Sequence, residues 1–155
     1  MRKLEKEYLR RFRKCQNTNG VLRLFNRFLL RRLSLRTHIQ IPYTTKIGDH
    51  FSIGHMGPVI INPGTVIGNN VCVNAGVTIG QENRGIRQGC STIGNTVWIG
   101  PNAVVVGEIN IGNDVLIAPN AYVNFDVPDH SVVIGNPGSI HYREHATEGY
   151  LKVYE

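Results

Sequence analysis

The chain has 155 residues, which is enough for one domain with a hydrophobic core of its own. Apolar residues make up 41% of it and charged residues 18%, and glycine occurs 17 times, a composition typical of many tight turns rather than of solvated helices. The net charge of +6 comes from residues 1–38, which hold twelve Lys/Arg and two Glu, whereas residues 39–155 hold five Lys/Arg and nine Asp/Glu. The larger part of the chain therefore shows no charge pattern of a nucleic-acid-binding protein.

Residues 1–38 are predicted to form a basic helical arm. Leu4, Tyr8 and Phe12 recur at helical spacing, and Asn19-Gly20 separates this helix from a second one over about residues 21–31. The second helix places an apolar stripe on one face, formed by Val21, Leu24, Phe25, Phe28 and Leu29. The stripe is expected to pack on the first coil of the following domain or on a neighbouring subunit. The arginines between the apolar residues alternatively favour peripheral contact with an anionic membrane surface or a lipid-phosphate-linked substrate.

No part of the arm is predicted to cross a membrane, because arginines interrupt its apolar run, and no signal peptide is recognised. The three cysteines, Cys15, Cys72 and Cys90, cannot all pair and have no zinc-finger spacing, so they are expected to be free thiols. These features predict a cytoplasmic protein.

Residues 39–140 contain a repeat of six residues, in which an aliphatic residue is usually followed by a small one. Neither an amphipathic helix nor an alternating strand has this period, whereas a parallel β-helix with three flat faces places one aliphatic side chain per face in a shared core. Gly, Asn and Asp at the corners are expected because they tolerate positive φ. The aliphatic positions are Ile41, Ile47, Ile53, Ile61, Ile67, Val73, Ile79, Ile93, Ile99, Val105, Ile111, Ile117 and Val123.

The repeat is interrupted twice, between Ile53 and Ile61 and between Ile79 and Ile93. Insertions in a solenoid must protrude from the coil, so residues 55–58 and 81–92 are predicted to be loops and candidate functional segments. After the coil, residues 131–134 are expected to form a closing strand that ends at 135–138, and residues 141–155 a polar tail.

His55 is the best candidate for a catalytic group, because it lies in the first interruption, at a predicted corner of the coil. Histidine can act as a general base near neutral pH, for example by removing a proton from an attacking hydroxyl. The alternative is a surface histidine in a turn.

Several segments resemble the serine acetyltransferase family, and still more its exopolysaccharide branch, the colanic-acid-type O-acetyltransferases. They are Thr45-Lys46-Ile47-Gly48, Ile53-Gly54-His55, Val59-Ile60-Ile61, the stretch from Trp98-Ile99-Gly100 to Asp126-Val127-Pro128, and Val133-Ile134-Gly135-Asn136-Pro137. The resemblance implies an all-β, left-handed parallel β-helix of the hexapeptide type, a homotrimer with active sites between subunits, and acetyl-CoA as cosubstrate. It also implies that His55 is the catalytic base.

The same resemblance implies that Gln40 occupies the position of the aspartate that orients the histidine. An amide can hold a histidine tautomer but cannot stabilise an imidazolium by charge. Gly54 and Gly89-Cys90 replace charged residues that the family uses for serine, and a desolvated amino acid needs charged partners. We therefore expect acetylation of a sugar hydroxyl in polysaccharide biosynthesis, with L-serine as the alternative acceptor.

For coenzyme A, the resemblance points to a groove between neighbouring coils near the C-terminal end. The expected contacts are Gly100, Pro101, Ala118 and Pro119 for the pantetheine arm, Asn124, Phe125 and Asn136 for the adenine end, and Arg143, or Arg84 or Arg87, for the phosphates.

Two rival functions remain open. His50 and His55 resemble half of the zinc site of γ-type carbonic anhydrases, but residues 56–129 contain no third histidine, so no metal site is predicted. A hexapeptide scaffold without catalytic activity would bind no coenzyme A and would not need His55.

Overall fold

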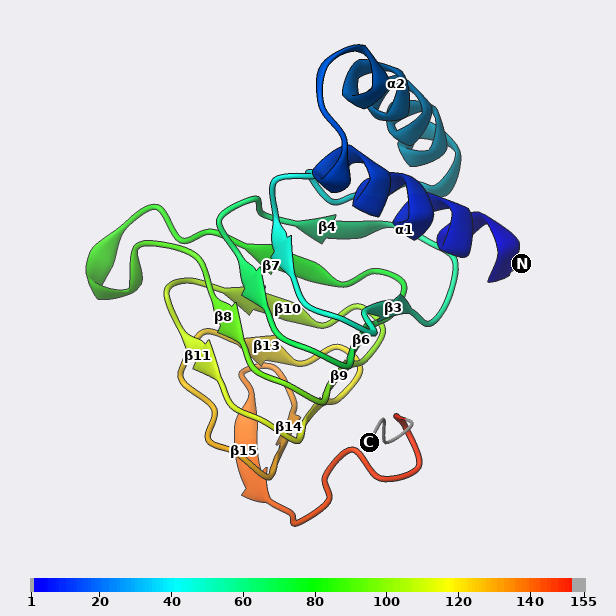
Figure 1. Cartoon of the computed structure of the whole chain (residues 1–155). Coiled ribbons are helices and arrows are strands. Elements are labelled where there is room, and N and C mark those ends of the chain that lie inside the picture. Colours follow the sequence, from blue (N-terminus) through cyan, green and yellow to red (C-terminus); the bar gives the residue numbers. More distant parts are fainter. Residues whose placement is uncertain (1, 152–155) are drawn as a thin grey trace.

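The computed structural model describes residues 2–151, and in it the chain forms a β-helix with a helical arm at one end (Figure 1). In chain order the short strands visit a first, a second and a third sheet in turn as far as β13, so that each of these coils contributes one strand to each face. The last coil meets the second sheet only through an isolated bridge between Ile111 and Val127. The first sheet contains β1 (Ile39–Gln40), β4 (Val59–Ile61), β7 (Thr78–Gly80), β10 (Val104–Val106) and β13 (Tyr122–Val123). The second contains β2 (Lys46–Ile47), β5 (Val66–Ile67), β8 (Thr92–Ile93) and β11 (Asn110–Ile111). The third contains β3 (Ser52–Ile53), β6 (Val71–Val73), β9 (Val97–Ile99), β12 (Val115–Ile117), β14 (Ser131–Ile134) and β15 (Ser139–Tyr142).

Strand pairing between coils is parallel except at the last strand, where β15 pairs with β14 in antiparallel register. The aliphatic positions of the repeat line the core, as predicted. Twelve of the thirteen are buried and Ile53 is half-buried: Ile41, Ile47, Ile61, Ile67, Val73, Ile79, Ile93, Ile99, Val105, Ile111, Ile117 and Val123. The predicted parallel β-helix is thereby confirmed, and its core is one continuous stack of Ile and Val.

Three edges separate the sheets and carry all the turns. The histidine edge, from the third to the first sheet, holds residues 54–58, 74–77, 100–103 and 118–121, and the β14–β15 hairpin turn at 135–138 lies on it beside β13. The loop edge, from the first to the second sheet, holds residues 42–45, 62–65, 81–91, 107–109 and 124–126. The tail edge, from the second to the third sheet, holds residues 48–51, 68–70, 94–96, 112–114 and 128–130.

The glycines that follow the aliphatic residues have a different role from the one the sequence suggested. Positive φ at the tail edge occurs on residues such as Asn70, Thr96 and Asp114, while Gly68, Gly94 and their equivalents have no positive φ. A Cβ built on Gly94 would instead lie 2.6 Å from the Gly112 carbonyl oxygen of the next coil. Glycine is therefore required here because the coils stack backbone against backbone.

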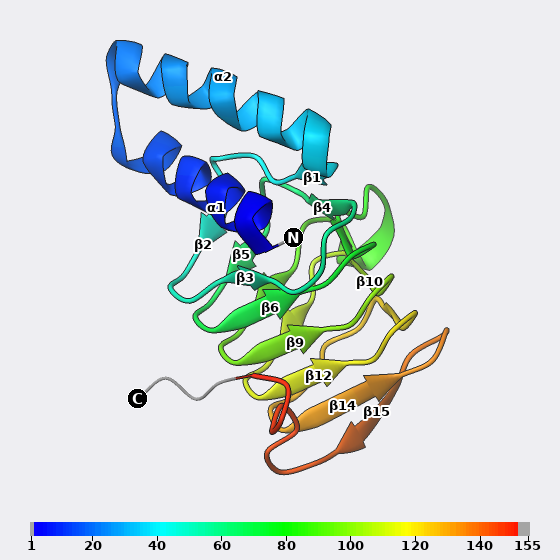
Figure 2. The same cartoon turned by 90° about the vertical axis from the view of Figure 1, so that its right-hand side faces the viewer.

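The arm consists of α1 (Arg2–Asn17) and α2 (Gly20–Thr37), which pack against each other beyond the first coil (Figure 2). α1 covers the end of the core with Tyr8 and Phe12, both buried, as their spacing predicted. The Tyr8 hydroxyl donates to the Ile41 carbonyl and accepts from the Ile41 amide, both at 3.1 Å. The basic arm is therefore an integral cap of the β-helix.

The expected packing of the α2 stripe on the first coil was wrong. The buried residues of α2 are Asn26, Leu30 and Thr37, on the opposite side of the helix. Val21, Leu24, Phe25 and Phe28 are between 56% and 83% exposed, and Leu29 is half-buried. The reason is that α1 already covers the coil, so α2 forms an outer layer and turns its stripe away from the protein.

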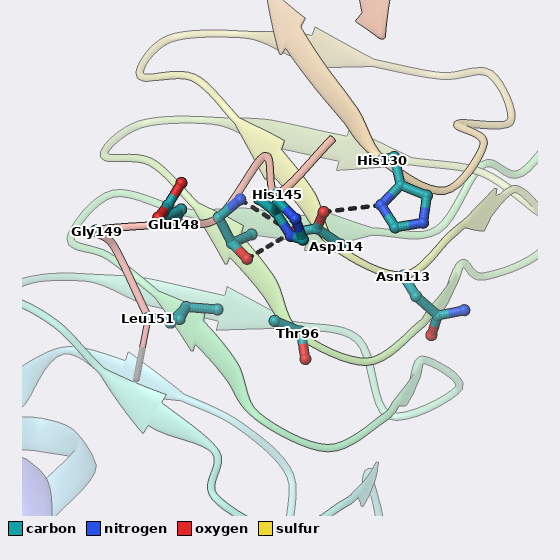
Figure 3. A pocket seen from close by; sticks show the side chains of 9 residues that line it. Thr96, Asn113, Asp114, His130, His145, Glu148, Gly149 and Leu151 are labelled. Carbon is teal, nitrogen blue, oxygen red and sulfur yellow. Dashed lines mark hydrogen bonds and ion pairs between the residues drawn. The ribbon is translucent and has the colours of Figure 1, made fainter. Parts of the chain in front are cut away.

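At the other end, β14 confirms the predicted closing strand, whereas β15 was not predicted and overlaps the start of the expected polar tail. Beyond β15 the tail turns back across the tail edge and is held there by Asp114 (Figure 3). The carboxylate of Asp114 accepts from the Ala146 and Thr147 amides at 3.0 Å and from the Thr147 hydroxyl at 2.7 Å. Its fourth partner is His130 Nδ1, at 2.9 Å.

Burial alone would raise the pKa of Asp114, but the hydrogen bonds from Thr147, His130 and Ala146 outweigh it and lower the pKa to about 2. A carboxyl whose pKa is lowered by folding stabilises the folded tail above its unfolded pKa, near 4, and loses this contribution as the pH falls through the folded value. The contribution is on the order of 2 kcal/mol.

We predict that Asp114→Ala releases the tail without unfolding the β-helix. Trp98 is the single tryptophan, and its ring lies 4.7 Å from that of Tyr150 in the tail, so its fluorescence reports docking. In the wild type this signal should change as the pH falls from about 4 toward 2, whereas in the variant it should already be altered at pH 7. The matched control is Asp49→Ala, an exposed carboxylate on the same edge. An unchanged signal in Asp114→Ala would refute the anchoring role.

Candidate active site

His55 lies on the histidine edge, in the protruding turn between β3 and β4, and its side chain is exposed. The insertion predicted around residues 55–58 therefore lies outside the coil. Below it on the same edge, the turns at 100–103 and 118–121 stack directly on each other. The Gly100 amide donates to the Ile117 carbonyl at 2.8 Å and the Asn120 amide to the Pro101 carbonyl at 2.9 Å.

Four of the predicted coenzyme A contacts, Gly100, Pro101, Ala118 and Pro119, thus share one edge with His55. Asn136 lies on this edge too, in the turn that ends β14. A Cβ on Gly100 would lie 2.6 Å from the Pro119 nitrogen, so these turns approach as closely as backbone allows. The edge therefore presents a run of small residues leading toward the histidine.

The remaining predicted contacts lie elsewhere. Asn124 and Phe125 follow β13 on the loop edge, where Phe125 packs against the core and its ring reaches the 135–138 turn, since a Cβ on Gly138 would lie 3.2 Å from Phe125 Cζ. Arg143 is at the tail edge, where its amide donates to the His130 carbonyl at 2.8 Å. Within one chain the structure therefore does not bring the whole predicted constellation together.

Gln40 lies in β1 on the first sheet, opposite Ile60, and its side chain is exposed. No hydrogen bond joins it to His55 in residues 2–151. Gln40 lines a separate cavity of about 400 Å³ with Ser34 and Asn62. Its role as the group that orients His55 stays a prediction.

The inserted loop on the loop edge, residues 81–91, contains a 3₁₀ turn (Gly85–Arg87). Glu82 and Gly89 pair across its base, and Arg87 contacts Asp126 two coils further at 3.4 Å. Ile86 at the tip is 100% exposed. The loop is therefore folded on its own edge and presents an apolar tip outward.

A cavity of about 520 Å³ lies beside the histidine turn, between α1 and the third sheet. It is lined by Glu5 of α1, by Ser52 and Gly54 next to His55, and by Asn70 and Tyr150. Glu5 is 5% exposed, and its Oε2 has no hydrogen-bond partner among the described residues. Sequence reasoning missed this carboxylate, because a single Glu among the basic residues of a helix carries no signal of burial.

The three cysteines are free, as predicted. Burial raises the pKa of Cys90, whose thiol lies 3.2 Å from Asn62 Oδ1, so this position favours the thiol over the reactive thiolate. No group of three or more His, Cys, Asp or Glu in residues 2–151 is arranged to hold a metal ion. Within the same residues, no helix is long and apolar enough to cross a membrane.

Comparison with known proteins shows which proteins this chain resembles. The family model of the bacterial transferase hexapeptide (six repeats) matches residues 90–124. The putative colanic acid biosynthesis acetyltransferase WcaB of Escherichia coli is 39% identical over 65% of this chain and 62% of its own length. Serine acetyltransferase of Bacillus pumilus is 36% identical over 67% of this chain and 48% of its own length. The chain thus spans less than two thirds of these curated relatives.

Among solved structures, Neisseria gonorrhoeae serine acetyltransferase matches 90% of this chain and 55% of its own with a TM-score of 0.75 at 26% identity. The soybean serine acetyltransferase apoenzyme matches 78% of this chain and 50% of its own with a TM-score of 0.67 at 29% identity. With the repeat and the three-faced coil, these matches define a hexapeptide-repeat protein with a left-handed parallel β-helix. Within that class, the chain resembles the serine acetyltransferases and the colanic-acid-type acetyltransferase, as the sequence motifs predicted.

Proposed function

We propose that the protein is an acetyl-CoA-dependent O-acetyltransferase whose acceptor is a sugar hydroxyl. The observation that carries the proposal is the position of His55 on the same edge as the stacked turns at 100–103 and 118–121. The relatives named above are acetyltransferases, and they support the reaction class.

In the proposed reaction, acetyl-CoA brings the activated acyl group, and the protein positions it and removes one proton. His55 accepts the proton of the acceptor hydroxyl as its oxygen attacks the thioester carbonyl. The tetrahedral intermediate collapses with loss of the coenzyme A thiolate, which takes the proton from the imidazolium. Backbone amides along the histidine edge would stabilise the developing oxyanion.

A homotrimer would explain why the predicted contacts are spread over several edges. If subunits associate with the histidine edge of one facing the loop edge of the next, then Asn124, Phe125 and the 81–91 loop complete the neighbour's site. The exposed Ile86 would contact the adjacent subunit in this arrangement. Arg143, on the tail edge, is the weakest member of the predicted phosphate site, and Arg84 in the loop is better placed. Light scattering measures the oligomeric mass and so tests whether the protein is a trimer.

The cavity beside Gly54 supports a saccharide acceptor. Ser52 and Glu5 offer hydrogen-bonding groups suited to hydroxyls, and Lys6 of α1 lies at the same cavity. Free serine remains the alternative, because serine acetyltransferases are among the relatives. Its ammonium and carboxylate require charged partners, and Glu5 and Lys6 are the charged groups that this cavity offers, so the acceptor assay decides between serine and a saccharide.

The test is release of free thiol from acetyl-CoA with L-serine compared with sugars and oligosaccharides. Turnover with saccharides alone supports the proposal, whereas turnover with L-serine alone makes the protein a serine acetyltransferase. Absence of coenzyme A binding by calorimetry would instead favour a scaffold without catalytic activity.

Glu5→Gln tests the acceptor cavity. Replacing an unpaired buried carboxylate by an amide weakens hydrogen bonds from acceptor hydroxyls, and charged hydrogen bonds are worth about 1.5–3 kcal/mol. We expect a KM for the acceptor raised about tenfold or more, with the KM for acetyl-CoA unchanged. Glu7→Gln is the control, because Glu7 on the same helix pairs with Arg10 and Arg11 instead. An equal rise in both KM values would place Glu5 outside the acceptor site.

A further inference from the structure

The outward face of α2 is the densest exposed apolar surface of the described chain. Residues 2–151 contain fourteen exposed large hydrophobic residues, and six of the nine that are more than half exposed belong to this one helix. They are Val21, Leu22, Leu24, Phe25, Phe28 and Leu35, each between 56% and 83% exposed. The other eight are scattered over the β-helix, its loop and the tail. Clustered exposure of this kind marks an interaction surface.

This face is also strongly basic. Arg31, Arg32 and Arg36 are exposed on the same helix, which contains no Asp or Glu. The net charge of residues 1–38 is +10, since they hold twelve Lys/Arg and two Glu. The aliphatic stems of arginine can lie along apolar surface while the guanidinium reaches polar groups beside it.

The position of α2 leaves this face open. α2 forms the outermost layer at the N-terminal end of the β-helix, beyond α1 and opposite to β14 and β15 (Figure 2). Its inner side is occupied by Asn26 and Leu30, and Arg11 Nη1 donates to Asn26 Oδ1 at 3.1 Å. Nothing in residues 2–151 covers the outer side.

A groove beside the helix adds an anion-binding element. It has a volume of about 490 Å³ and lies between α2 and the turn after β1, with Leu24 and Phe28 on the helix side. Arg27 and Arg31 line it as well, and the Arg27 guanidinium is held 5.3 Å above the Tyr43 ring. A phosphate group would meet two cations next to apolar side chains here.

We infer that α2 lies flat on an anionic lipid bilayer, with its leucines and phenylalanines at the level of the acyl chains and its arginines on headgroup phosphates. Exposed Leu and Phe together with arginine are typical of interfacial helices, and the arginine stems can lie along the apolar surface while their guanidinium groups reach the phosphates. A second copy of this chain is the poorer partner, because it would bring the same arginines against these without any acidic residue to pair them. The inference is independent of the acetyl transfer proposed above.

The experiment is co-sedimentation of the full chain with vesicles of phosphatidylcholine alone or mixed with phosphatidylglycerol. We expect binding only to the mixed vesicles, and loss of this binding at high salt. Phe25→Ser/Phe28→Ser and Arg32→Glu/Arg36→Glu should each lower the bound fraction about tenfold or more. Matched controls are Ile140→Ser/Tyr142→Ser, exposed apolar residues on β15, and Lys46→Glu, an exposed cation on β2, all of which should bind as wild type.

The substituted side chains are exposed, so every variant should stay folded, and circular dichroism verifies this. Wild-type protein that does not sediment with the mixed vesicles overturns the inference, and so does equal binding by the α2 variants. If Phe25→Ser/Phe28→Ser lowers the oligomeric mass in light scattering and no vesicle binding is seen, the face is a subunit interface and the inference is wrong.

Discussion

His55→Ala should reduce acetyl transfer about a hundredfold or more, while the β-helix stays folded. A general base contributes roughly 10²–10⁴ to the rate, and no other described side chain of the same turn can accept a proton. His55 is exposed and outside the core, so its truncation removes no buried contact. Steady-state thiol release under saturating acetyl-CoA measures the rate, and calorimetry with coenzyme A shows whether cosubstrate binding is retained.

The loss should appear in kcat, because a base acts in the transition state and contributes little to ground-state binding. His141→Ala is the control, since His141 is exposed on β15 at the far end of the β-helix. Rates like those of the wild type in His55→Ala would remove this residue from the mechanism. In that case retained coenzyme A binding would still support the proposed cosubstrate, and its absence would favour the scaffold.

Gly94→Ala should destabilise the fold by about 1–3 kcal/mol, the range of overpacking substitutions. The added methyl group would lie 2.6 Å from the Gly112 carbonyl oxygen and 2.8 Å from its carbon, and backbone of a neighbouring coil cannot move aside as a side chain can. The two coils would have to separate, which weakens the backbone hydrogen bonds between them on this edge, from the Gly94 amide to the Ile111 carbonyl and from the Asp114 amide to the Asn95 carbonyl. Thermal or denaturant unfolding followed by circular dichroism measures the change.

Gly80→Ala provides the matched control within the same solenoid. A Cβ at Gly80 meets Val106 Cγ2 at 3.6 Å, an ordinary van der Waals contact, and its φ is not positive. We expect the midpoint of the unfolding transition of this variant to stay close to that of the wild type. Equal destabilisation of both variants would mean that the close backbone contact between successive coils is not the reason for glycine at position 94.

The sequence alone determined the β-helix, because a six-residue repeat of aliphatic residues leaves no other way to bury one side chain per face. It also located both protruding segments, since residues added to a coil of fixed circumference must leave it. The short closing strand Ser131–Ile134 and the free thiols followed from equally local patterns. His55 could be singled out for the same reason, as the histidine inside an insertion.

Only the tertiary structure decided which surfaces face inward. The apolar stripe of α2 was predicted from the sequence to be a packing face, but α1 covers the first coil and the stripe remains exposed. The repeat glycines were predicted from the sequence to form turns, but glycine is needed there because a Cβ would collide with the backbone of the next coil, which no local pattern encodes. Likewise Asp114 is partnered by Thr147, about 30 residues away in the tail, and Glu5 lines a cavity with residues about 50 positions away, next to the histidine turn. Contacts between distant segments depend on the stacking of whole coils, and the sequence of any one segment does not contain them.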